Sequence, residues 1–186
     1  ITILAKNTSV RYGDYKINVV DTPGHADFTA EMERALRIID FAVLVVSSAE
    51  GIQAHTETIW RMLRAAGAPV FLFLNKTDRA GADPGRVYAE LRARFSPDIT
   101  DMDAGFTPEV LTALAERDDE FLEAYLGGEP DEAGALAAAR RLVGAGRLFP
   151  CLRGAALRGE GVDRLLRALD GLTETHYDAA APFGGT

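Results

Sequence analysis

The sequence predicts an α/β fold in which helices cover both faces of a mostly parallel β-sheet. Two apolar runs, 41–48 and 70–76, are nearly continuous in Val, Leu and Phe, as strands buried on both faces of a sheet are. Stretches with the helical spacing of apolar residues alternate with such runs, as a parallel sheet with crossover helices requires. In folds of this class ligands bind beside the carboxyl ends of the strands, so the residues that follow each strand are candidates for a site.

Five strands and three flanking helices are expected. The strands cover residues 7–12, 16–21, 41–48, 70–76 and 149–156, and the middle three are apolar enough to be buried parallel strands. The helices cover residues 25–40, 55–67 and 161–172.

The alternation of strand and helix stops between residues 96 and 147. This region holds helical stretches around 107–125 and 131–143 and no clear strand. We expect it to be a helical insertion at one edge of the sheet and not a second domain.

Length, charge and cysteine content limit the class of protein. The 186 residues predict one domain, residues 1–178, followed by an Ala-, Pro- and Gly-containing linker at 179–186 that leads toward further domains. The net charge of −8 predicts no DNA partner, and any RNA contact would have to use a local patch. Cys151 is the only cysteine, which fits a reducing cytoplasm, and no run approaches the roughly 18 apolar residues of a membrane helix. We therefore expect a cytoplasmic protein without a membrane partner.

The apolar run 16–21 ends abruptly at an acid. Asp21 is followed by Thr-Pro-Gly and then His25. The turn offers one carboxylate, the backbone N–H of Gly24, which no side chain screens, and one imidazole. A helix-capping Asp or an ordinary turn would explain this stretch if it stood alone. Its position at the end of a strand favours a place that holds a ligand.

A second polar motif follows the run 70–76. Asn75, Lys76 and Asp78 have the spacing N-K-x-D. A carboxylate can accept both N–H donors on one edge of guanine in a planar bidentate arrangement, and adenine presents no matching pair. Asp78 is therefore the candidate guanine reader, Asn75 can tie the loop down and reach the base, and the stem of Lys76 can cover the face of the base.

Either motif alone has a simpler explanation. A four-residue N-K-x-D match also fits a solvated turn. Two such motifs, each after a buried strand, favour a nucleotide site, and Asp78 disfavours an enzyme that uses ATP.

With these motifs the chain resembles the GTP-binding domain of the translational GTPases, the elongation factor G group. Residues 1–3 (Ile-Thr-Ile) resemble the end of the first switch of the family, 21–25 the second switch, 75–78 the guanine-specificity motif and 153–166 the last guanine motif. The stretch 51–83, with a short helical insertion after it, resembles the ribosomal protection proteins of tetracycline resistance. The resemblance implies a P-loop NTPase-like three-layer αβα sandwich that hydrolyses GTP to GDP and phosphate on the ribosome.

The resemblance also implies roles at the phosphate end of the site. Thr2 would ligate Mg²⁺ and touch the γ-phosphate, and Asp21 would hold Mg²⁺ through a water molecule. The N–H of Gly24 would bond the γ-phosphate, and His25 would orient the attacking water.

At the guanine end, the resemblance assigns a backbone donor. The N–H of Ala156 would bond the guanine O6, with Leu157 beside it. Ala155 stands where the family usually has Ser, which removes a hydroxyl worth about 1 kcal/mol of local hydrogen bonding.

One motif of the family is missing. The phosphate loop G-x-x-x-x-G-K-[ST] occurs nowhere in the 186 residues. By resemblance it would lie upstream of residue 1, with a first strand that belongs between 16–21 and 41–48. We therefore expect an N-terminally truncated domain that is inactive by itself. The alternative is a non-catalytic interaction module that binds a partner and no nucleotide.

Overall fold

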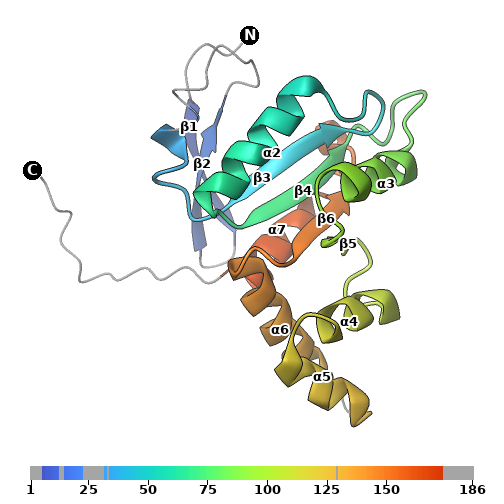
Figure 1. Cartoon of the computed structure of the whole chain (residues 1–186). Helices are drawn as coiled ribbons and strands as arrows, with labels where there is room; N and C mark the ends of the chain where they lie inside the picture. The colour runs from blue at the N-terminus through green and yellow to red at the C-terminus, as the bar shows by residue number, and fades with distance from the viewer. Residues whose placement is uncertain (1–5, 13–14, 23–31, 33, 129, 174–186) are drawn as a thin grey trace, which may run out of the picture.

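The computed structural model describes residues 6–12, 15–22, 32, 34–128 and 130–173. Its main sheet is parallel, with the strand order β3-β4-β6-β5 (Figure 1). The strands are β3 (Ala42–Ser47), β4 (Val70–Asn75), β6 (Phe149–Arg153) and β5 (Ile99–Asp101). The predicted parallel sheet is thus confirmed for the apolar runs that became β3, β4 and β6.

Helices cover both faces of this sheet, which makes the predicted three layers. The elements are α2 (Ala54–Ala66) and α3 (Pro84–Arg94) on one face, and α6 (Glu132–Gly144) and α7 (Val162–Leu172) on the other. Side chains alternate along β4, so that Leu72 packs into the α2–α3 core and its neighbour Phe71 into the α6–α7 core. Both side chains are fully buried, so β4 is the central strand of the fold.

The insertion between the sheet strands is helical apart from one short strand, β5. It contains α4 (Pro108–Ala115), α5 (Asp119–Leu126) and then α6. The predicted helical stretches around 107–125 and 131–143 are confirmed. The first is divided in two because the side chain of Asp118 accepts a hydrogen bond from the N–H of Phe121 and starts α5. The expectation of no strand in this region is wrong, because β5 lies within it.

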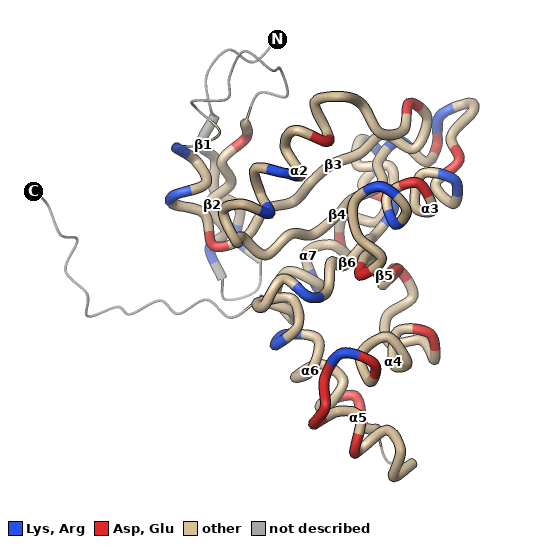
Figure 2. Tube along the Cα trace, in the orientation of Figure 1, with Lys and Arg blue, Asp and Glu red and all other residues tan. Residues whose placement is uncertain are grey.

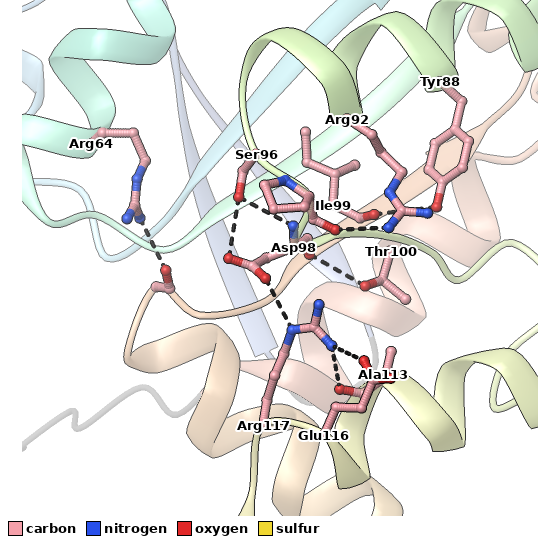
Figure 3. Close-up of polar contacts among 12 residues, drawn as sticks. Arg64, Tyr88, Arg92, Ser96, Asp98, Ile99, Thr100, Ala113, Glu116 and Arg117 are labelled. Carbon is pink, nitrogen blue, oxygen red and sulfur yellow. Dashed lines mark hydrogen bonds and ion pairs between the residues drawn. The ribbon is translucent and has the colours of Figure 1, made fainter.

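Strand β5 is short; it pairs with β6, its Ile99 is buried in the core, and the polar contacts in Figure 3 flank it. Asp98, which precedes it, accepts from Arg117 Nε at 3.0 Å, and Arg117 also donates to the carbonyl of Ala113 at 2.8 Å. On the other side, the hydroxyl of Tyr88 on α3 donates to the carbonyl of Ile99 at 3.2 Å. Three residues are too few for a periodic signal, so the parallel pairing with β6, supported by these polar partners, makes the segment a strand.

The first two strands form a separate antiparallel hairpin. Strands β1 (Lys6–Tyr12) and β2 (Tyr15–Asp21) pair with each other, and β2 has no strand partner in the parallel sheet within the described residues. The expectation that 16–21 is a buried parallel strand is therefore wrong in this structure: Val19 is exposed. Apolar composition indicates that a strand packs, but it does not indicate which strand it pairs with or in which direction.

Helix α3 was missed, although its start carries a readable signal. Asp83 caps it by accepting from the N–H of Arg86 at 2.9 Å, and Pro84 occupies the first helical position. Of the predicted helix 25–40, Met32, Arg34 and Ala35 are helical. No helix within the described ranges is long and apolar enough to cross a membrane.

Candidate functional site

Two loops meet beyond the carboxyl ends of the neighbouring strands β4 and β6. The side chain of Asn75 joins them: its Oδ1 accepts from the N–H of Lys76 at 2.8 Å and from the N–H of Ala156 at 3.0 Å. A backbone bond from the N–H of Thr77 to the carbonyl of Gly154, at 3.2 Å, adds a second connection. The structure therefore brings the two predicted guanine motifs together, as parallel strands that end at one edge of a sheet require.

The loop after β4 is held in an unusual conformation. Lys76 has φ +63°, and it is the only non-glycine residue with a positive φ among those described. Such a conformation costs about 1–2 kcal/mol, so the surrounding contacts must enforce it. The bond from its N–H to Oδ1 of Asn75 is one such contact. The Nζ of Lys76 lies 3.7 Å from Glu50 in a largely exposed ion pair, which contributes little energy. The charged end of Lys76 thus lies near the loop after β3.

Asp78, the predicted guanine reader, has an ionic partner in this structure. Its Oδ2 lies 2.9 Å from Nε of Arg158. The side chain of Asp78 is 22% exposed, whereas that of Arg158 is 62% exposed. The contact joins the loop after β4 to the short 3-10 helix η2 (Ala156–Arg158), which follows β6.

The loop after β6 is a tight, self-bonded turn. The N–H of Ala155 donates to the carbonyl of Glu160 at 3.0 Å, and the N–H of Glu160 donates back to the carbonyl of Ala155 at 3.2 Å. Ala155 is buried, and Leu157 is almost fully exposed. Gly161 has φ +79°, and a Cβ there would overlap the carbonyl oxygen of Arg153. Backbone bonds therefore brace this loop, although Ala155 lacks the hydroxyl that the family usually has there.

The predicted phosphate end is described only in part. Asp21 is the last residue of β2, and it is exposed. Thr2, Gly24 and His25 lie outside the described residues, as does the expected linker 179–186. A strand-end carboxylate is a hard oxygen donor of the kind that Mg²⁺ prefers, so Asp21 fits the predicted ligand. Within the described ranges, no group of three or more His, Cys, Asp or Glu residues could hold a metal ion by itself.

The groups with shifted pKa values have structural explanations. Burial raises the pKa of the Cys151 thiol to about 12, so this cysteine is a neutral core residue. Hydrogen bonds from Arg141 are the main cause that lowers the pKa of Asp118, at the start of α5. Figure 2 shows acidic and basic residues next to one another around α3 and at the start of α5. The acidic cap of α5 is thus paired with an arginine and forms part of the structure of the insertion.

Two residues of the site were not found from the sequence. Arg158 lies within the last guanine motif, 153–166, but no local pattern indicates that it would reach Asp78. Ser48, directly after β3, donates its N–H to the carbonyl of Asn75 at 2.8 Å. Among the described residues, its Oγ is the only buried side-chain polar atom without a hydrogen-bond partner. The sequence signal for Ser48 was its position directly after the apolar run that became β3, where residues of a ligand site are expected.

The comparison with protein families identifies the class of protein. Residues 1–175 match the family described as the elongation factor Tu GTP binding domain, and the chain belongs to this family. The crystal structure of a protein from Thermus thermophilus superimposes with a TM-score of 0.84 at 24% identity, over 94% of this chain and 32% of that one. This likeness supports the P-loop NTPase-like fold.

The chain is similar to relatives of two kinds, tetracycline resistance proteins and elongation factor G. The chain is 39% identical to an oxytetracycline resistance protein of Streptomyces rimosus, over 100% of this chain and 32% of that protein. It is 40% identical to the tetracycline resistance protein TetM of Streptomyces lividans, over 92% and 29%. It is 35% identical to an elongation factor G of Dehalococcoides mccartyi, over 91% and 31%. The chain is thus similar both to elongation factor G and to the tetracycline resistance proteins, and it spans about a third of the length of these relatives.

The loop after β6 allows a matched test of its tight packing. Gly161 and Gly159 both have a positive φ, of +79° and +75°, but only at Gly161 would a Cβ meet neighbouring backbone. Gly159→Ala is expected to lower the free energy of unfolding by about 1–2 kcal/mol, from backbone strain alone. Gly161→Ala is expected to lower it by about 3 kcal/mol or more, because strain and overlap add. Urea denaturation of both variants measures the difference, and equal losses would contradict this packing.

Proposed function

We propose that, within the protein that carries it, this domain binds GTP and hydrolyses it to GDP and phosphate on the ribosome. The observation that carries the proposal is the pair of loops after β4 and β6. They place the carboxylate of Asp78 and the N–H of Ala156 on two segments that the side chain of Asn75 ties together. A fixed carboxylate beside a fixed backbone donor matches the edge of guanine, which presents two N–H donors next to one carbonyl.

Asp78, Ala156 and Lys76 each contact a different part of guanine in this proposal. Asp78 accepts from N1–H and N2–H of the base, and Ala156 donates to O6. The stem of Lys76 covers one face of the ring, since the loop holds its backbone at φ +63°. The N–H of Ala156 bonds to Asn75 in this structure, so O6 shares this donor with Asn75 when the base binds.

The phosphate end supplies the hydrolytic chemistry. Asp21 and Thr2 are the proposed residues that hold Mg²⁺, and the ion when bound neutralises charge on the phosphates. The N–H of Gly24 bonds a γ-phosphate oxygen, and His25 orients a water molecule for in-line attack. A bond then forms between the water oxygen and the γ-phosphorus, and the bond from that phosphorus to the bridging oxygen breaks. The products are GDP and inorganic phosphate.

The role of the whole protein is inferred from its relatives. We infer that residues 1–178 form the nucleotide-binding domain, that 179–186 lead toward further domains, and that the protein acts on the ribosome in the cytoplasm. Elongation factor G and the tetracycline resistance proteins are similar to the chain to about the same degree. Both translocation and ribosomal protection therefore fit as the step that this GTPase serves.

A second candidate function has one observation in its favour. The 186 residues contain no G-x-x-x-x-G-K-[ST] loop, so on their own they lack a cradle for the most charged part of the nucleotide. In this alternative the chain is an interaction module that binds a partner without nucleotide. Isothermal titration of the 186-residue chain with GTP and Mg²⁺ is expected to give very weak binding or none. Micromolar affinity would contradict the proposed need for a separate phosphate loop.

Asp78→Asn tests the assignment of the guanine reader. The change replaces one carboxylate oxygen by an amide donor, which opposes the N–H donors of guanine and suits the carbonyl of xanthine. In the full-length gene product, GTP affinity is expected to fall about 10- to 100-fold and XTP affinity to rise. Competition binding with the two nucleotides measures both changes. Unchanged GTP affinity would rule out Asp78 as the reader.

His25→Ala tests the assignment of the water-orienting residue. A group that acts only in the transition state lowers turnover and leaves ground-state affinity alone. The full-length variant is expected to bind GTP as the wild type does and to lose about 100-fold or more of its ribosome-stimulated turnover. His55→Ala is the matched control, because His55 is an exposed residue of α2. Equal turnover of the His25 variant and the wild type would refute this role.

A further inference from the structure

The ion pair between Arg158 and Asp78 places a positive group where guanine would bind. Nε of Arg158 lies 2.9 Å from Oδ2 of Asp78. A guanidinium is planar and presents several N–H donors, and the edge of guanine that Asp78 would read is also planar and presents two. Both groups seek the same acceptor. They cannot occupy the same space in front of the carboxylate.

The backbone of Arg158 is fixed, but its side chain is free to leave. Its N–H donates to the carbonyl of Ala155 at 2.8 Å, and the N–H of Gly159 donates to the carbonyl of Ala156 at 3.0 Å. Gly159 ends the 3-10 helix at φ +75°. These bonds hold the turn in place, whereas the arginine side chain is 62% exposed. The guanidinium can therefore turn into solvent without moving the N–H of Ala156.

We propose that Arg158 is a positioning residue that covers the guanine-reading carboxylate of Asp78 in the nucleotide-free protein and competes with guanine for it. The inference rests on the proposed function, because it requires that Asp78 reads guanine. When the base binds, the guanidinium leaves Asp78 and the two N–H donors of guanine replace it. Arg158 thereby lowers guanine-nucleotide affinity and keeps the carboxylate paired when the site is empty.

The exposed side chain of Arg158 sets how strongly its ion pair with Asp78 can compete with guanine. Ion pairs with a largely exposed partner contribute little, so the competition is expected to weaken binding by about two- to fivefold. Salt screens such a pair, so the effect is expected to shrink as ionic strength rises.

The test measures GDP affinity in the full-length gene product. Arg158→Ala is expected to bind GDP about two- to fivefold more tightly than the wild type. Arg158→Lys, which keeps the charge without the planar donors, is expected to lie between them. The gain of Arg158→Ala over the wild type is expected to decline as KCl is raised from about 0.05 M to about 1 M.

Arg167→Ala is the matched control for the loss of one positive charge. Arg167 is similarly exposed and is paired with Asp163 at 2.8 Å within α7. The control removes the same charge from a neighbouring element, and it is expected to leave GDP affinity unchanged.

A double variant separates this role from a structural one. In Asp78→Asn the carboxylate is gone, so adding Arg158→Ala is expected to leave XDP affinity unchanged. The inference is overturned if Arg158→Ala binds GDP no more tightly than the wild type, or if its gain persists in the Asp78→Asn background. If the wild type binds no GDP, or if Asp78→Asn does not shift preference toward XDP, the proposed function falls and this inference falls with it. If Asp78→Asn shifts preference toward XDP but Arg158→Ala does not change GDP affinity, only this inference is overturned and the proposed function stands.

Discussion

The side chain of Asn75 is the contact on which the candidate site depends. Its one carbonyl oxygen accepts two backbone N–H groups, from the next residue and from Ala156, 81 positions away in the chain. Each such hydrogen bond contributes only about 0.5–1.5 kcal/mol of net stability, so its geometric effect matters more than its energy. Together with the bond from the N–H of Thr77 to the carbonyl of Gly154 and the ion pair of Asp78 with Arg158, this side chain holds the loops after β4 and β6 next to each other.

The rigidity of β4 makes that contact possible. Its residues Val70–Leu74 are at most 2% exposed, and β3 and β6 pair with it on its two edges. A strand enclosed on four sides cannot shift its register by one residue without moving every side chain to the opposite face. The strain at Lys76 is therefore tolerated, because the residues before it are held by the core and the residues after it by the loop of β6.

The helical insertion contrasts with β4, because it lies toward one end of the sheet and not in its centre (Figure 1). Helices α4, α5 and α6 pack on one another and on α7 in a core that also contains Phe71 of β4, and Arg117, between α4 and α5, donates to Asp98 just before β5 (Figure 1, Figure 3). At the start of the insertion, Asp101 and Asp103 contact Arg153, the last residue of β6, and Asp103 also contacts Arg164 of α7. The start of the insertion therefore supports the strand end from which the loop of Ala156 leaves.

The sequence by itself determined the class of fold, the runs that became β3, β4 and β6, and the two polar motifs that meet in the candidate site, because these depend on local apolar patterns and on residues close together in the chain. Only the tertiary structure decided the pairing of β2 with β1, the three-residue strand β5 and the ion pair of Arg158 with Asp78. Each of these depends on a partner outside its own segment: the edge of β1 for β2, the edge of β6 for β5, and a side chain on another loop for Asp78. A one-dimensional pattern records that a residue is apolar or charged, but only the folded chain selects which of the many possible partners lies within reach.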